Sequence, residues 1–130
     1  MIKVGHALVL IHRNVTYFPL GGTMSTAPKS KILNLTEMVA YQDGAVVSRQ
    51  ITKAEAGNVT LFAFDKEQGL SEHTAPYDAL AQILEGEAEV TISGQTFQLK
   101  AGDAIIMPAD EPHALKAIQK FKMLLSMIRA

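Results

Sequence analysis

Apolar and polar residues alternate in short runs through most of the chain. The clearest run is 87–92, where Ala88, Val90 and Ile92 alternate with glutamate and threonine. A period of two residues places apolar side chains on one face of a strand. Turn residues such as Ser93-Gly94 separate the runs. The pattern predicts strands over residues 45–52, 58–64, 79–84, 87–92, 96–99, 104–107, 113–117 and 121–128.

Many short strands with glycine turns, and almost no helical period, predict an all-β barrel or sandwich. Residues 1–18 are also rich in β-formers, and Arg13-Asn14 could turn one strand into another. A frayed arm is the alternative for this segment. Residues 19–31 have the composition of a linker. We therefore expect an N-terminal extension over 1–31 and a barrel domain over 32–130.

The start of the barrel domain carries weaker signals. Residues 32–35 have the composition of a short strand. Asn34 is followed three residues later by Glu37, which is a capping-box spacing and predicts one helical turn over 36–40. At most one short helical turn is expected in the whole chain.

Composition excludes several classes of protein. The chain has 130 residues, of which 48% are hydrophobic and 19% charged, so one folded domain is expected rather than disorder. The net charge is −1 without a basic stripe, which disfavours nucleic-acid binding. The chain has no cysteine, so disulfides and thiolate metal sites are excluded, and a cytoplasmic location is expected. No stretch is long enough to span a membrane.

Two stretches, 69–86 and 102–113, stand out for their spacing of histidine, glycine and proline. Together they resemble the two signature motifs of the cupin superfamily, which read G-x5-H-x-H-x3-E-x6-G and G-x5-P-x-G-x2-H-x3-N. The second motif matches at Gly102, Pro108 and His113, with Asp110 in a glycine slot and Ala117 in the asparagine slot.

The first motif matches in its spacing, but several of its positions hold other residues. His73 holds the first histidine slot and Gly86 the closing glycine. Ala75 stands in the second histidine slot, Ala79 in the acid slot, and Glu67 where the opening glycine would be. The resemblance covers about residues 45–128 and implies a double-stranded β-helix, or jelly-roll, barrel.

The resemblance also implies where metal ligands would lie. In metal-containing cupins three histidines and an acid converge inside the barrel, so His73 and His113 are expected to meet in the cavity. Two imidazoles alone make a poor site for iron, manganese, nickel or zinc. Asp78 is the nearest further carboxylate, but by alternation it points away. His6 and His12 could contribute only if the N-terminal arm folds over the barrel mouth.

The function stays open between binding and catalysis. A small-molecule pocket would be lined by small and polar residues of the two motifs: His73, Ala75, Tyr77, Ala79, Ala81 and His113. One alternative is a metal-dependent oxygenase or isomerase that uses His73 and His113. The other is a metal-free acid–base isomerase with His73, Tyr77 and Asp78 as candidate catalytic residues.

The last predicted strand is apolar on both faces. Its apolar residues are Phe121, Met123, Leu124, Leu125, Met127 and Ile128. A strand that is apolar on both faces is normally covered on both faces. We therefore predict a homodimer in which a second subunit packs on the outer face of the sheet.

Overall fold

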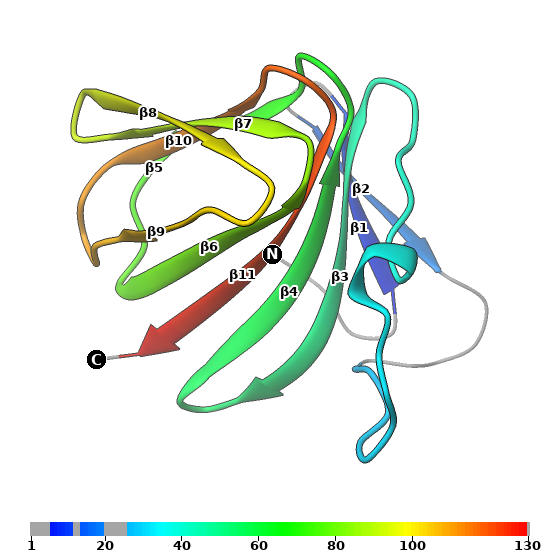
Figure 1. Cartoon of the computed structure of the whole chain (residues 1–130). Helices are drawn as coiled ribbons and strands as arrows, with labels where there is room; N and C mark the ends of the chain where they lie inside the picture. The colour runs from blue at the N-terminus through cyan, green and yellow to red at the C-terminus, as the bar shows by residue number, and fades with distance from the viewer. Residues whose placement is uncertain (1–5, 12–13, 20–25, 130) are drawn as a thin grey trace.

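The computed structural model describes the backbone of residues 6–11, 14–19 and 26–129, and the side chains of residues 26–129. Two antiparallel sheets face each other (Figure 1). The larger sheet has the order β2-β1-β3-β4-β11-β6-β9, and the smaller sheet has the order β5-β10-β7-β8. The larger sheet consists of β1 (His6–Ile11), β2 (Asn14–Pro19), β3 (Ala45–Ala54), β4 (Gly57–Phe64), β6 (Tyr77–Glu85), β9 (Ala104–Met107) and β11 (Phe121–Arg129). The smaller sheet consists of β5 (Gly69–His73), β7 (Glu87–Ile92), β8 (Gln95–Lys100) and β10 (His113–Ala117).

The fold is the predicted all-β jelly-roll barrel. Strands β7, β9 and β10 have the bounds that alternation gave, and the other predicted strands of the barrel differ by one to two residues at an end. Strand β5 was not predicted, because its sequence Gly-Leu-Ser-Glu-His has a single apolar side chain and no clear alternation.

The core between the two sheets is built from the inward residues of each strand. On β11 these are Phe121, Met123 and Leu125, which alternate with less buried residues. The Phe121 ring stacks on Phe64 with centroids 4.4 Å apart and planes 8° apart, and both side chains are fully buried. Aromatic pairs of this kind add to the stability gained from burying the area.

A second apolar cluster lies on the outer face of the larger sheet. Residues 26–44 cross this face and bury Ala27 and Val39 against Val47, Ile51 and Leu61. Partly buried residues that pack on this cluster include Leu84 of β6 and Leu124 of β11. The chain itself therefore covers part of the outer face that we expected a second subunit to cover.

The local predictions for residues 32–40 were wrong in detail. Residues 32–35 form no strand, and Ile32 is fully exposed. The helical turn is a 3-10 helix, η1 (Leu35–Glu37), and the Asn34 side chain makes no capping hydrogen bond to it. The Asn34 carboxamide instead accepts a hydrogen bond from the Thr36 hydroxyl at 3.1 Å. A turn this short has few unpaired backbone N–H groups for a cap to satisfy.

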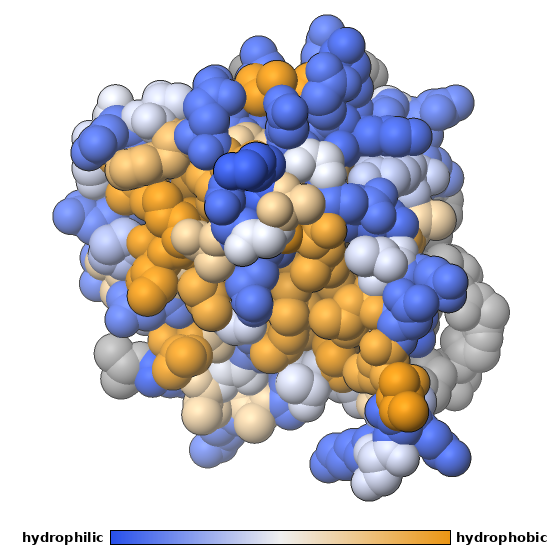
Figure 2. Space-filling model, in the orientation of Figure 1, coloured by the Kyte–Doolittle hydropathy of each residue, from blue (hydrophilic) through white to orange (hydrophobic). Residues whose placement is uncertain are grey.

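Apolar side chains also gather on the outer face near β9, β6 and β11 (Figure 2). Ile106 of β9 is 61% exposed and Ile128 of β11 is 62% exposed. Leu80 of β6 pairs in register with Ile106 and is half-buried. Residues 26–44 thus leave an apolar part of this face open, and the homodimer stays a prediction.

Two positions of the signature motifs have backbone conformations that explain their residues. Gly86 has φ +83°, and a Cβ atom there would lie 1.9 Å from the Lys120 carbonyl oxygen. Only glycine fits such a close approach. Asp110, in a glycine slot, has φ 63°. Aspartate is among the residues that tolerate this left-handed region.

The part of the chain that the structure describes contains no helix that is both long and apolar enough to cross a membrane.

Candidate functional site

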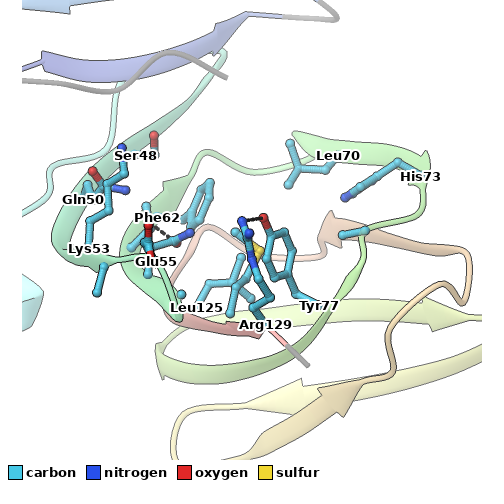
Figure 3. Close-up of a pocket in the computed structure, with 16 residues that line it drawn as sticks. Ser48, Gln50, Lys53, Glu55, Phe62, Leu70, His73, Tyr77, Leu125 and Arg129 are labelled. Carbon is cyan, nitrogen blue, oxygen red and sulfur yellow. Dashed lines mark hydrogen bonds between the residues drawn. The ribbon is translucent and has the colours of Figure 1, made fainter.

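A cavity of about 510 Å³ lies inside the barrel (Figure 3). Strands β3, β4, β5, β6 and β11 supply its walls. Its lining combines apolar side chains with polar and charged ones. The lining residues are Ser48, Gln50, Lys53, Ala54, Glu55, Gly57, Asn58, Thr60, Phe62, Leu70, His73, Ala75, Tyr77, Leu125, Met127 and Arg129.

The two motif histidines meet, as the resemblance implied, but only His73 lines the cavity. His73 ends β5 and His113 begins β10, and the two residues are direct partners across the antiparallel pair. Their ring centroids are 4.4 Å apart, and the rings meet edge to face at 67°. His73 is exposed and lines the cavity, whereas His113 is 5% exposed, packs against His73 and is not among the lining residues.

Hydrogen bonds to the backbone fix the tautomer of both rings. The Nδ1 of His73 lies 2.8 Å from the Ser71 carbonyl oxygen, and the Nδ1 of His113 lies 3.1 Å from that of Glu111. A carbonyl oxygen can only accept, so each Nδ1 carries a proton and donates it. When the rings are neutral, each Nε2 is therefore the atom that can accept a proton or a hydrogen bond.

The pKa of His113 is lowered from its ordinary value. Burial is the largest cause, and the nearby His73 lowers the pKa further, while the bond to the Glu111 carbonyl opposes both. Burial disfavours the charged imidazolium because it removes water from the ring. His113 is therefore neutral at pH 7.

This shift predicts how stability depends on pH. Below the ordinary histidine pKa of about 6.5, the unfolded chain binds a proton at His113 that the folded chain does not bind. The free energy of unfolding should therefore fall as pH decreases from about 6.5 towards the lower pKa of the folded state. Urea unfolding of the wild type and of His113→Gln between pH 8 and pH 5 measures the effect.

Comparison with His113→Gln isolates the contribution of His113 to the pH dependence, because the variant and the wild type share all other titrating groups. We expect the free energy of unfolding to depend less on pH in His113→Gln than in the wild type over this interval. The same dependence in both proteins would contradict the assigned shift.

The described residues do not fit a metal centre. No three histidine, aspartate or glutamate side chains within the described ranges are grouped closely enough to hold a metal ion. The slots that would complete the set hold Ala75 and Ala79, whose methyl groups cannot coordinate. Catalytic zinc usually has three protein ligands, and non-haem iron two histidines and a carboxylate. His73 and His113 alone fall short of both sets.

The predicted pocket residues on β6 divide into two groups. Ala75, just before the strand, and Tyr77, its first residue, line the cavity. Ala79 and Ala81 do not line it, since they are 2% and 0% exposed and belong to the core between the sheets. Ala79 pairs with Met127 and with Met107 in the neighbouring strands. The large side chains of these two methionines thus fill the space beside the small Ala79.

Two further candidates stand away from the cavity or outside the described residues. Asp78 is exposed, and its Oδ1 accepts a hydrogen bond from the Ala109 backbone N–H at 2.9 Å. Its carboxylate therefore holds the loop between β9 and β10 and does not line the cavity. His12 and the side chain of His6 lie outside the part of the chain that is described.

Polar side chains of β3 and β4 that were not predicted also line the cavity. Ser48, Gln50 and Thr60 are at most 7% exposed and line the cavity. The Gln50 Oε1 atom is buried without a hydrogen-bond partner in the structure. A buried unpaired carboxamide oxygen is uncommon and costs free energy. The available signal was the phase of β3, where Ser48 and Gln50 alternate on the same inward face as Val46.

A charged group at the cavity was also missed. Arg129, the last residue of β11, donates a hydrogen bond from Nη2 to the Tyr77 hydroxyl at 3.0 Å (Figure 3). Its guanidinium carbon lies 5.5 Å from the centroid of the Tyr77 ring. Register explains the contact, because Arg129 and Tyr77 are partners across β11 and β6. The two residues are 52 positions apart in the sequence, so no local pattern indicates their contact.

Comparison with known proteins identifies the family. A model of the cupin domain matches residues 60–128. A conserved protein of unknown function from Streptococcus pyogenes is 36% identical with a TM-score of 0.76, over 84% of this chain and 98% of that one. A cupin superfamily protein from Desulfitobacterium hafniense is 28% identical with a TM-score of 0.75, over 81% of this chain and 96% of that one.

A curated relative, an uncharacterized protein from Aquifex aeolicus, is 26% identical over 102 residues, which are 77% of this chain and 84% of the relative. The domain match covers both motif histidines and more than half of the chain. With the jelly-roll barrel and the paired His73 and His113, these likenesses lead to one conclusion: the chain belongs to the cupin family.

Proposed function

We propose that this cupin binds a small organic molecule in its barrel cavity, with the His73 and His113 pair as polar groups at one side. The observation that carries the proposal is the cavity itself, whose apolar floor meets a few polar side chains. This combination is typical of small-molecule sites. The volume of about 510 Å³ is in the usual range for such sites.

The state of the histidines supports a binding role. The Nδ1 of His73 donates to a backbone carbonyl, so its Nε2 is left to accept from a ligand in the cavity that it lines. His113 is held against His73, which orients the exposed ring. Ser48, Gln50 and Thr60 add polar side chains from β3 and β4 to the lining. A ligand with a hydrogen-bond donor would satisfy the His73 Nε2.

Mass spectrometry of the purified chain tests this proposal. Protein made without an affinity tag or chelator is denatured, and the released small molecules and metals are measured together. We expect an organic ligand in the wild type and at least about tenfold less of it in His73→Ala, the loss expected from one or more hydrogen bonds to a ligand. Gln95→Ala, an exposed change on β8, is the control that should retain it.

Two results would contradict the proposal. One is stoichiometric iron, manganese, nickel or zinc that is lost in His73→Ala or His113→Ala. That result would favour the metal-dependent oxygenase or isomerase. The other is a cavity ligand whose amount is the same in wild type and both histidine variants.

A metal-free acid–base isomerase is the second candidate. It is favoured by one observation, that His73 and the Tyr77 phenol line the same cavity. An imidazole that can accept at Nε2 and a phenol can form a proton-transfer pair. A turnover that survives chelators and is lost in His73→Ala would support it. Turnover unchanged in His73→Ala would exclude it.

The proposal includes the predicted homodimer and cytoplasmic location. The exposed Ile106 and Ile128 on the outer face support a second copy as partner, because buried apolar area stabilises association. Sedimentation equilibrium distinguishes a dimer from a monomer.

A further inference from the structure

The cavity carries a cation that is fixed in place near the end of the chain. The backbone N–H of Arg129 donates to the Ala56 carbonyl oxygen at 2.7 Å. Its side chain donates to the Tyr77 hydroxyl at 3.0 Å and lies over the Tyr77 ring. Backbone and side chain are thus both held at the cavity wall.

No protein carboxylate neutralises this cation among residues 26–129. Within that range the one ion pair joins Lys100 and Asp103, neither of which lines the cavity. Arg129 and Lys53 both line the cavity, and neither forms an ion pair with a described residue. Glu55 lines it as well, so the three charged side chains leave an excess of one positive charge.

The arginine also retains unused hydrogen-bonding capacity. A guanidinium has five N–H donors, and the described contacts of the Arg129 side chain use one of them. Arginine binds carboxylates in a planar, two-point geometry that lysine cannot reproduce. The hydrogen bond to the Tyr77 hydroxyl and the contact with its ring restrict the guanidinium, which lowers the entropy cost of such binding.

The remaining walls constrain the rest of the ligand. Phe62, Leu70 and Leu125 form apolar surface within the same cavity. In Figure 3 Arg129 and Tyr77 lie together in the middle of the view, and Leu70 and His73 lie together at the upper right. A ligand that extends from the arginine over this surface has an anionic end and an apolar body.

We propose that the ligand is a small organic carboxylate, bound at its charged end by Arg129 with Lys53 nearby, and with its apolar part against Phe62, Leu70 and Leu125. This inference rests on the proposed small-molecule function and names its ligand class. Tyr77 is a positioning residue, which acts through Arg129. A cationic ligand is disfavoured because Glu55 is outnumbered by Arg129 and Lys53.

Binding of two matched probes tests the ligand class. Hexanoate and hexanamide share an apolar chain and differ in charge. Isothermal titration is carried out with both probes on the wild type, Arg129→Gln, Arg129→Lys, Tyr77→Phe and Lys116→Gln. Lys116 is exposed on β10 and outside the cavity lining, so its variant controls for the loss of one positive charge.

We expect the wild type to bind hexanoate more tightly than hexanamide. Arg129→Gln should weaken hexanoate binding about tenfold, as expected for one charge-assisted contact at an open mouth. Hexanamide binding should change by less than about twofold, since it has no charge to lose. Arg129→Lys and Tyr77→Phe should fall between wild type and Arg129→Gln for hexanoate, and Lys116→Gln should match wild type.

Several outcomes overturn the inference: no hexanoate binding at millimolar concentration, no preference for hexanoate, or equal weakening of both probes by Arg129→Gln. His73→Ala separates the inference from the proposed function. If His73→Ala weakens both probes while Arg129→Gln affects neither, the cavity function stands and the carboxylate class fails. If hexanoate binding depends on Arg129 and not on His73, the carboxylate class stands and the role of the histidine pair fails.

Discussion

Replacing Gly86 with alanine should destabilise the fold by about 3 kcal/mol, because two costs add at this position. The new Cβ would lie 1.9 Å from the Lys120 carbonyl oxygen and 2.7 Å from the Phe121 Cα. The backbone at Gly86 and at residues 120–121 must move apart to admit it. The left-handed φ of +83° adds a separate cost of about 1 kcal/mol. The free energy of unfolding in urea measures the sum.

Gly94 provides a matched control for this prediction. Its φ of +84° is nearly the same, but nothing lies within 4 Å of its added Cβ. Gly94→Ala should therefore lose only about 1 kcal/mol, the cost of the left-handed backbone. Equal losses in the two variants would show that the close approach at Gly86 has no energetic weight.

Replacing Phe121 with alanine should cost about 3–5 kcal/mol of stability, the range for a large buried aromatic side chain. The side chain is fully buried, stacks on Phe64 and belongs to the core between the sheets. Its removal leaves a cavity that the two sheets cannot close. Thermal and urea unfolding of the variant report the loss.

Gln95→Ala is the control for this change. Gln95 is exposed on β8, so its truncation should alter stability by no more than about 0.5 kcal/mol. Phe121 also borders Gly86, so the effects of Gly86→Ala and Phe121→Ala should not add. A loss below about 1 kcal/mol in Phe121→Ala would contradict the assigned place of this ring in the core.

The strands of the barrel could be predicted because their alternation matches the face that each one buries. On β7 the small and branched residues point inward and the glutamates outward, and the structure keeps that phase. The pairing of His73 with His113 could be predicted because motif spacing fixes their frame. The conformation of residues 32–40 could not be predicted, because it depends on contacts with the outer face of β3 and β4 rather than on local propensity.

The polar side of the site was harder to predict. Ser48 and Gln50 are polar residues on the inward face of a strand, and which face is inward depends on closure of the barrel. A register shift between Gln50 and Thr52 also interrupts the alternation. Arg129 and Tyr77 meet only through the pairing of β11 with β6. Long-range pairing of this kind leaves no local signal in the sequence.

The loop that carries Ala75 and the loop before His113 are tied together. The Asp110 backbone N–H donates to the Ala75 carbonyl oxygen at 2.8 Å, and the Asp78 carboxylate accepts from the Ala109 N–H at 2.9 Å. Two hydrogen bonds therefore join segments that are more than thirty residues apart in the sequence, at the side of the cavity where the histidines lie. A substitution that breaks either bond is therefore expected to loosen both segments together.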